Sequence, residues 1–79
     1  MKLEIITPEA QLFQGEVSMV QVPGKKGAFQ ILSHHAPIIS TLDPGEIRVV
    51  LRSGEEKKFP VIYGVVECES DQIQVLIEK

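Results

Sequence analysis

Short stretches in which apolar and polar residues alternate are the main pattern of this chain. The clearest stretch runs from Glu46 to Arg52, and similar ones lie at Lys2–Thr7 and Gln72–Glu78. Successive residues of a strand point to opposite faces, so one face of each stretch is expected to be buried. The apolar positions on these faces are Leu3, Ile5, Ile47, Val49, Leu51, Ile73, Val75 and Ile77.

Glycine and proline interrupt the chain too often for long helices. The six glycines and five prolines leave few windows of the roughly 10 to 12 residues that a helix requires. Four segments carry residues typical of turns, and each predicts a reversal into an antiparallel neighbour. These segments are Pro23-Gly24-Lys25-Lys26-Gly27, Asp43-Pro44-Gly45, Ser53-Gly54 and Ser70-Asp71.

The apolar positions also change parity at two places. One change lies around Gly64, between Tyr63, expected on the inner face, and Val66, and the other lies between Met19 and Val20. One extra residue in a β-bulge produces such a change, so a bulge is predicted at each place. The pattern gives about eight to ten short strands and no substantial helix, which predicts an all-β sandwich or barrel. At this length, residues 1–79 form a single domain.

Charge and cysteine content exclude several classes of protein. Lysine and arginine number 8 against 11 acids, a net charge of -3 with no basic cluster, so nucleic acid is not an expected partner. The longest apolar run, residues 61–66, is far shorter than the roughly 20 residues of a membrane span. The N-terminal residues lack the pattern of a signal peptide. The single cysteine, Cys68, forms no intramolecular disulfide, which agrees with a reducing compartment.

The adjacent histidines His34 and His35 do not predict a metal site. Neighbouring residues of an extended chain point in opposite directions, and no third histidine is present. Ser33 beside His34 lacks a nucleophile elbow and an acid partner, so nucleophilic catalysis is not expected. Pro37 favours an extended Ala36 and thereby holds His35 at a defined exit from its turn, where a polar loop residue often contacts a partner.

Other polar residues also lack the pattern of a catalytic or ligand site. Residues 24–27 lack the spacing, the hydroxyl residue and the helix of a phosphate-binding loop, so a solvated hairpin tip is predicted. Glu67 and Glu69 share a solvated strand face, whereas Cys68 is predicted to be a small buried residue. No cofactor is therefore expected, and binding is the expected function.

The apolar pair Ile38-Ile39, followed by Ser40-Thr41-Leu42, has two interpretations. Adjacent residues of a strand face opposite sides, so one isoleucine either reaches an interface or lies in a strand buried on both faces. The residues alone do not decide between these two interpretations.

The order of these residues resembles the ε subunit of F-type ATP synthases, in its N-terminal β-sandwich. The resemblance covers essentially the whole chain. Its most specific part is the triplet His35-Ala36-Pro37, placed between the glycine-containing loop and the turn after Leu42. The matching segments are Leu3–Glu9, Leu12-Phe13, Gly15–Val17, Val22–Gly24, Gly27, His35–Pro37, Leu42, Pro44-Gly45, Ile47-Arg48, Gly54-Glu55, Gly64–Glu67 and Ile73–Leu76.

This resemblance implies a ten-stranded β-sandwich of two five-stranded sheets. It also implies a non-catalytic subunit of the rotor stalk, which binds the γ subunit and the c-ring and helps to couple ion translocation to ATP synthesis. The partners would belong to one complex with the α, β and δ subunits, and the chain would not form a homo-oligomer. Its expected place is the cytoplasmic face of the energy-transducing membrane, as a peripheral membrane protein. A different class, an unrelated small β-sandwich adaptor that binds along an open sheet edge, is the alternative.

The resemblance also assigns two surfaces. The loop expected to face the c-ring comprises Gly24, Lys25, Lys26, Gly27, Ala28 and His35. The strand expected to face γ comprises Ile38, Ile39, Ser40, Thr41 and Leu42. Family members commonly carry an acid and a glycine at the positions of Ala28 and Gln30, and Pro-Gly at the positions of Ser33 and His34. Many bacterial members continue into a two-helix hairpin, so no helix-based inhibition of hydrolysis is expected from residues 1–79.

Overall fold

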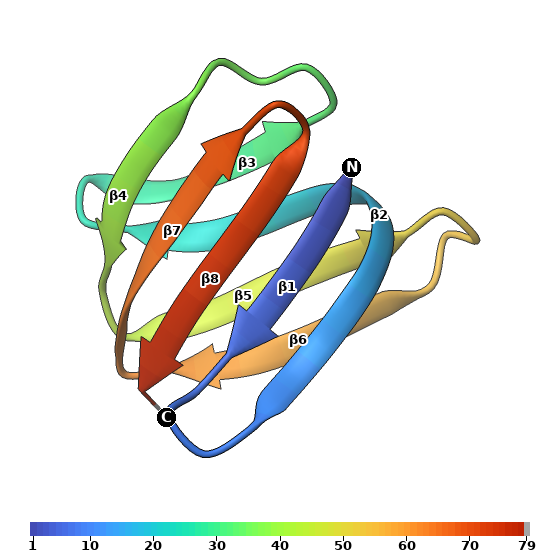
Figure 1. The fold of residues 1–79 in the computed structure, drawn as a ribbon. Helices are drawn as coiled ribbons and strands as arrows, with labels where there is room; N and C mark the ends of the chain where they lie inside the picture. Colours follow the sequence, from blue (N-terminus) through green and yellow to red (C-terminus); the bar gives the residue numbers. More distant parts are fainter. Residues whose placement is uncertain (79) are drawn as a thin grey trace.

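Eight β-strands make up the fold in the computed structural model, which describes residues 1–78 (Figure 1). No helix occurs among these residues, as the alternating pattern predicts. The strands are β1 (Lys2–Ile6), β2 (Gln11–Gly24), β3 (Gly27–Leu32), β4 (Ile38–Leu42), β5 (Gly45–Leu51), β6 (Glu56–Val61), β7 (Tyr63–Glu69) and β8 (Gln72–Glu78).

The strands form two layers that share the long strand β2 (Figure 1). In the front sheet, β8 pairs with β7 and in parallel with β1, while β7 pairs with β4 and β1 pairs with the first half of β2. In the rear sheet, the second half of β2 lies between β3 and β5, and β6 pairs with β5. The all-β sandwich is therefore confirmed. The expected count of ten strands is not confirmed, since the described residues form eight strands and the 14-residue strand β2 serves both sheets.

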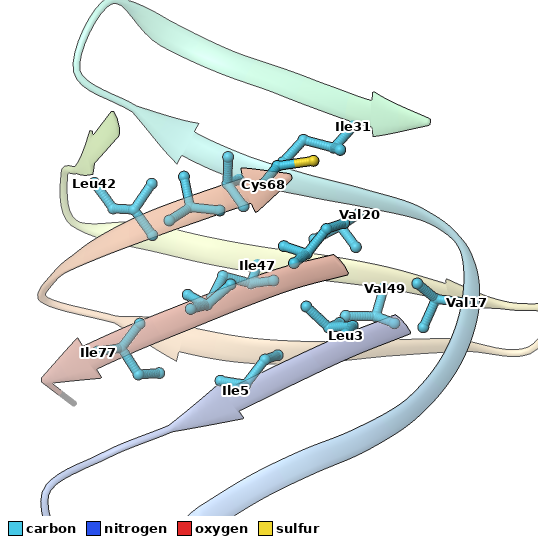
Figure 2. Packing of buried hydrophobic residues seen from close by; sticks show 14 of the residues in the cluster. Leu3, Ile5, Val17, Val20, Ile31, Leu42, Ile47, Val49, Cys68 and Ile77 are labelled. Carbon is cyan, nitrogen blue, oxygen red and sulfur yellow. The ribbon is translucent and has the colours of Figure 1, made fainter. Parts of the chain in front are cut away.

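The core lies between the two sheets and is entirely apolar apart from one thiol (Figure 2). All but one of the inner-face positions predicted for β1, β5 and β8 are buried, and Leu51 is half-buried against this core. No polar or charged residue is buried among those that the structure describes. The buried residues are Leu3, Ile5, Val17, Val20, Val22, Ile31, Leu42, Ile47, Val49, Val61, Val66, Cys68, Ile73, Val75 and Ile77. Such burial is the main force that stabilises a fold of this size.

Three of the four predicted turns join antiparallel neighbours. They connect β2 to β3, β5 to β6 and β7 to β8. The prediction for Asp43-Pro44-Gly45 is wrong, because β4 pairs with β7 in the front sheet whereas β5 pairs with β2 and β6 in the rear sheet. This turn therefore carries the chain from one layer to the other, which local turn chemistry does not reveal.

The two changes of parity have different causes. The bulge predicted at Gly64 is wrong, since β6 ends at Val61 in the rear sheet and β7 begins at Tyr63 in the front sheet. As a result Tyr63 does not face the core and is 56% exposed. The other change is a register irregularity between β2 and β5, which falls between Val17 and Met19, close to the predicted position. It bends β2 where this strand passes between the sheets.

Candidate functional site

The histidine, cysteine and acidic side chains are the residues on which a catalytic or metal site would depend. Within residues 1–78, no group of three or more histidine, cysteine, aspartate or glutamate side chains is placed to hold a metal ion. His35 is half-buried, and its Nδ1 lies 2.7 Å from the carbonyl oxygen of the adjacent Ala36. His34 instead contacts Asp71 in the β7–β8 hairpin. The two histidines thus have separate partners.

The thiol of Cys68 is buried in the core, as its parity predicts (Figure 2). Burial raises the pKa of this thiol above its ordinary value, and the negative charge of Asp71 raises it further. The thiolate is the reactive form of cysteine, so this residue is chemically inert near neutral pH. Cys68 therefore acts as a small apolar residue of the core.

The Lys25-Lys26 turn is an exposed hairpin tip whose shape depends on the glycines beside it. At Gly24, an added Cβ would lie 2.7 Å from the Phe29 ring, which fills that space. Gly27 has a φ of 117°, a conformation that side chains disfavour. Both lysines and Ala28 are exposed. The turn therefore presents two exposed positive charges at the β2–β3 connection.

His35 lies beyond the other end of β3. This strand begins at Gly27 and ends at Leu32, so it spans roughly 16 Å between the lysine turn and the loop that carries His35. The structure thus does not gather the loop residues assigned to the c-ring into one pocket. They lie towards the two ends of β3, which pairs with β2 at an edge of the rear sheet (Figure 1). We call Gly24–Ala28 and His35 the β3 strip.

Strand β4 resolves the two interpretations of the isoleucine pair. Ile38 is half-buried against the core, while Ile39 points outward and is 71% exposed. Ser40 is half-buried, Thr41 is exposed and Leu42 is buried, so the strand has one inner and one outer face. The interpretation of a strand buried on both faces is wrong. An interface for Ile39 stays a prediction.

The outer face of the front sheet carries an apolar patch that the sequence pattern did not reveal. The cross-strand neighbours of Val65 in β7 are Thr41 in β4 and Leu76 in β8, and Leu76 in turn pairs with Ile6 in β1. A shallow groove of about 300 Å³ lies on this row, with Tyr63 on its wall. We call Ile6, Ile39, Tyr63, Val65 and Leu76 the front-face patch.

A sequence signal for this patch exists in β8. Leu76 has the opposite parity to the buried residues Ile73, Val75 and Ile77, so a large apolar side chain occupies an outward position. Leu76 is 46% exposed. Single exposed apolar residues are ordinary, but several on one face mark an interaction site.

The outer face of the rear sheet carries a polar network centred on Arg48. Arg48 in β5 donates hydrogen bonds to Gln21 Oε1 in β2 at 2.9 and 3.2 Å, and to Glu56 Oε1 in β6 at 3.2 Å. These contacts link three neighbouring strands and leave their charges solvated. The same face also carries apolar side chains, because the exposed Leu32 in β3 pairs with Met19 in β2, and Met19 pairs with Val50 in β5.

The fold is thus that of a small β-sandwich that exposes several apolar side chains on its outer surface. A family model described as "ATP synthase, Delta/Epsilon chain, beta-sandwich domain" matches residues 1–79. The chain belongs to this family.

Individual relatives agree with this assignment. The chain is 40% identical over 78 residues to the ATP synthase epsilon chain of a Nitratiruptor species, covering 99% of this chain and 60% of the relative. It is 38% identical over 77 residues to the ATP synthase epsilon chain of Chlorobium limicola, covering 98% of this chain and 88% of the relative. The chain therefore spans little more than half of some relatives and most of others.

Solved structures share the fold. One chain of the Euglena gracilis mitochondrial ATP synthase structure, described as OSCP/F1/c-ring, matches with a TM-score of 0.92 at 15% identity, over 98% of this chain and 49% of that one. One chain of the Tetrahymena thermophila mitochondrial ATP synthase structure, described as central stalk/cring, matches with a TM-score of 0.83 at 15% identity, over 99% of this chain and 63% of that one. At such identity these likenesses show the fold alone.

Proposed function

We propose that this chain is a non-catalytic subunit of the rotor stalk of an F-type ATP synthase. It binds the γ subunit through the front-face patch and the c-ring through the β3 strip, and it helps to couple ion translocation to ATP synthesis. The observation that carries the proposal is the 71% exposure of Ile39, on the strand that the family resemblance assigns to γ. Family membership and the names of the relatives support the assignment to an ATP synthase.

The location of the domain follows from this assembly. The structure shows no membrane-spanning helix within residues 1–78. Contact with the c-ring places the domain beside the membrane, on its cytoplasmic face, as a peripheral subunit in one complex with α, β, γ and δ. One copy of the chain would serve each complex.

The proposed γ-binding face carries a row of apolar side chains, which suits a permanent contact. Ile39 lies diagonally across from Val65, because Ile39 pairs with Glu67 two residues further along β7. Diagonal neighbours on one face of a sheet lie about 7 to 8 Å apart, so Ile39 is within reach of the row formed by Val65 and Leu76. A γ surface that covers this row would remove exposed apolar side chains from water.

A pair of matched variants tests the γ contact. Ile39→Lys places a charge in the proposed interface, and Ile62→Lys makes the same change at a site that is 61% exposed, outside the front-face patch. Burial of one large aliphatic side chain contributes about 1.5 to 3 kcal/mol, so we expect Ile39→Lys to weaken binding to purified γ at least tenfold. Ile62→Lys should bind like the unmodified chain. Equal affinities for all three chains would contradict the proposed interface.

A second matched pair tests the c-ring contact. Lys25→Glu combined with Lys26→Glu reverses two charges in the β3 strip, and Lys57→Glu combined with Lys58→Glu makes the same change of net charge on β6. We expect only the first pair to weaken co-sedimentation with c-rings in lipid vesicles. The loss should shrink as salt is added, because salt screens exposed charges. Equal binding by both double variants would show that the lysine turn is not part of the c-ring interface.

A further inference from the structure

The β3–β4 loop and the β7–β8 hairpin are joined by the carboxylate of Asp71. The backbone N–H of His34 donates a hydrogen bond of 2.7 Å to Asp71 Oδ1, across 37 residues of sequence. The His34 Nδ1 lies 3.7 Å from the other carboxylate oxygen, Oδ2. In Figure 1 the end of β3 lies beside the β7–β8 turn near the N-terminus. Because this bond is to the His34 backbone, Asp71 contacts the β3–β4 loop itself as well as the exposed imidazole of His34.

Unusual backbone conformations gather at this junction. Among residues 1–78, the residues other than glycine with a positive φ are His34 at 65°, Ser70 at 52° and Asp71 at 60°. Ser70 and Asp71 form the two-residue turn between the paired residues Glu69 and Gln72, where hairpins favour a positive φ at both positions. His34 is instead the third residue of a turn from Leu32 to His35, and the contact with Asp71 adds to the hydrogen bond that closes this turn. Such conformations persist where surrounding contacts hold them, and the carboxylate supplies such a contact.

Asp71 is itself held firmly. Its backbone carbonyl oxygen accepts a hydrogen bond of 3.0 Å from the N–H of Lys2, at the start of β1. Lys2, Glu16 and the N-terminal amine line the same shallow depression as Ser70 and Asp71, and the amine pairs with Glu16 at 3.3 Å. Within this cluster, the carboxylate of Asp71 bonds to the β3–β4 loop through the N–H of His34.

We propose that Asp71 is a positioning residue for the β3–β4 loop. Its carboxylate fixes the backbone of His34 in the left-handed conformation, and this sets the direction in which His35, Ala36 and Pro37 lead into β4. The N–H of His35 bonds to the carbonyl oxygen of Leu32 at 3.1 Å, which closes the turn on its other side. The consequence for c-ring binding rests on the proposed function, whereas the positioning itself does not.

Two substitutions of Asp71 separate the carboxylate from the turn. Glycine and asparagine both tolerate a positive φ, so Asp71→Gly and Asp71→Asn each keep the hairpin. Asparagine keeps an acceptor oxygen and glycine does not. Hydrogen exchange of single amides, followed by NMR on the full chain, is the measurement. We expect exchange of the His34 amide to accelerate at least roughly tenfold in Asp71→Gly and less than about threefold in Asp71→Asn.

An internal control distinguishes loop release from general destabilisation. The N–H of Gly54 donates to the Leu51 carbonyl at 2.9 Å in the β5–β6 hairpin, which is separate from the β7–β8 turn (Figure 1). Its exchange should be unchanged in both variants. The proposal is overturned if the His34 amide exchanges at the same rate in Asp71→Gly as in the unmodified chain, or if the His34 and Gly54 amides accelerate together.

A second background tests whether the carboxylate acts on the conformation of His34. Glycine adopts a positive φ without assistance, so His34→Gly should make the loop less dependent on Asp71. We expect Asp71→Gly to shift the amide resonances of His35 and Ala36 at least twofold less in the His34→Gly background. Equal shifts in both backgrounds would overturn the proposal.

Binding to c-rings separates this inference from the proposed function. If both are correct, Asp71→Gly weakens co-sedimentation with c-rings in vesicles and Asp71→Asn does not. If the His34 amide is released but c-ring binding is unchanged, the positioning role stands and the assignment of His35 to the c-ring interface fails.

Discussion

Replacing Gly64 by alanine should destabilise the fold, because the first residues of β7 lie against β8. A Cβ at Gly64 would lie 2.5 Å from the carbonyl oxygen of Leu76 and 2.9 Å from Cγ2 of Ile77. The carbonyl belongs to the backbone of a paired strand, so relief requires a shift of β8 rather than a side-chain rotation. Overpacking of this kind costs about 1 to 3 kcal/mol.

That cost is large for a chain of this size. A domain of 79 residues is expected to have a free energy of unfolding of about 4 to 12 kcal/mol. A loss of about 2 kcal/mol lowers the melting temperature of a domain this small by roughly 8 to 16 °C. Urea denaturation followed by circular dichroism measures the free energy of unfolding, and a thermal scan measures the melting temperature.

Gly15→Ala is the matched control. Gly15 also lies within a strand, but an added Cβ there meets only the Phe13 ring at 3.6 and 3.8 Å, which is ordinary contact. We expect its free energy of unfolding to stay within about 0.5 kcal/mol of the unmodified chain, or to rise through the reduced entropy of the unfolded state. If Gly64→Ala were as stable as Gly15→Ala, the packing of β7 on β8 would not be close enough to require glycine at residue 64.

Three further predictions concern single features of the fold. The pKa of the Cys68 thiol is raised in the fold, so the thiol stays protonated at a pH where the unfolded chain has lost that proton. The free energy of unfolding should therefore fall as pH rises above about 8.5. In urea titrations at pH 7 and 10, Cys68→Val should show a smaller fall than the unmodified chain. Ser70→Gly should raise the melting temperature by a few degrees, because glycine accepts the φ of 52° without strain, and an unchanged or lower value would count against strain at this turn. The rings of Phe13 and Phe59 meet edge to face with centroids 6.1 Å apart, so a double-mutant cycle to leucine should give a coupling of about 0.5 to 1.5 kcal/mol, and a coupling near zero would show that the rings do not interact.

Local periodicity predicts the strands that have one solvent-exposed and one buried face. In β5, for example, Ile47 and Val49 face the core while Glu46 is exposed. The passage of the chain between layers was not predictable in this way. The turn at residues 43–45 looks like a hairpin, yet the partners of β4 and β5 lie elsewhere in the sequence. Tyr63 was placed on the wrong face for the same reason.

The candidate surfaces are likewise predictable from the sequence only in part. The sequence identified Ile38 and Ile39 as a pair with one unexplained member, and the structure shows which one is exposed. The front-face patch depends on cross-strand neighbours from β1, β4, β7 and β8, so no short segment contains it. The contact between His34 and Asp71 likewise joins residues far apart in the sequence. Non-local pairing is therefore the information that residue patterns lacked.

Co-purification tests the central claim most directly. An affinity tag placed after the last residue, with membranes of the native cell extracted in mild detergent, would capture whatever complex contains the chain. The account predicts recovery of γ, the catalytic subunits and the c-ring in a fixed ratio to the tagged chain. Recovery of the chain alone, or with unrelated proteins, would contradict a role in the rotor stalk.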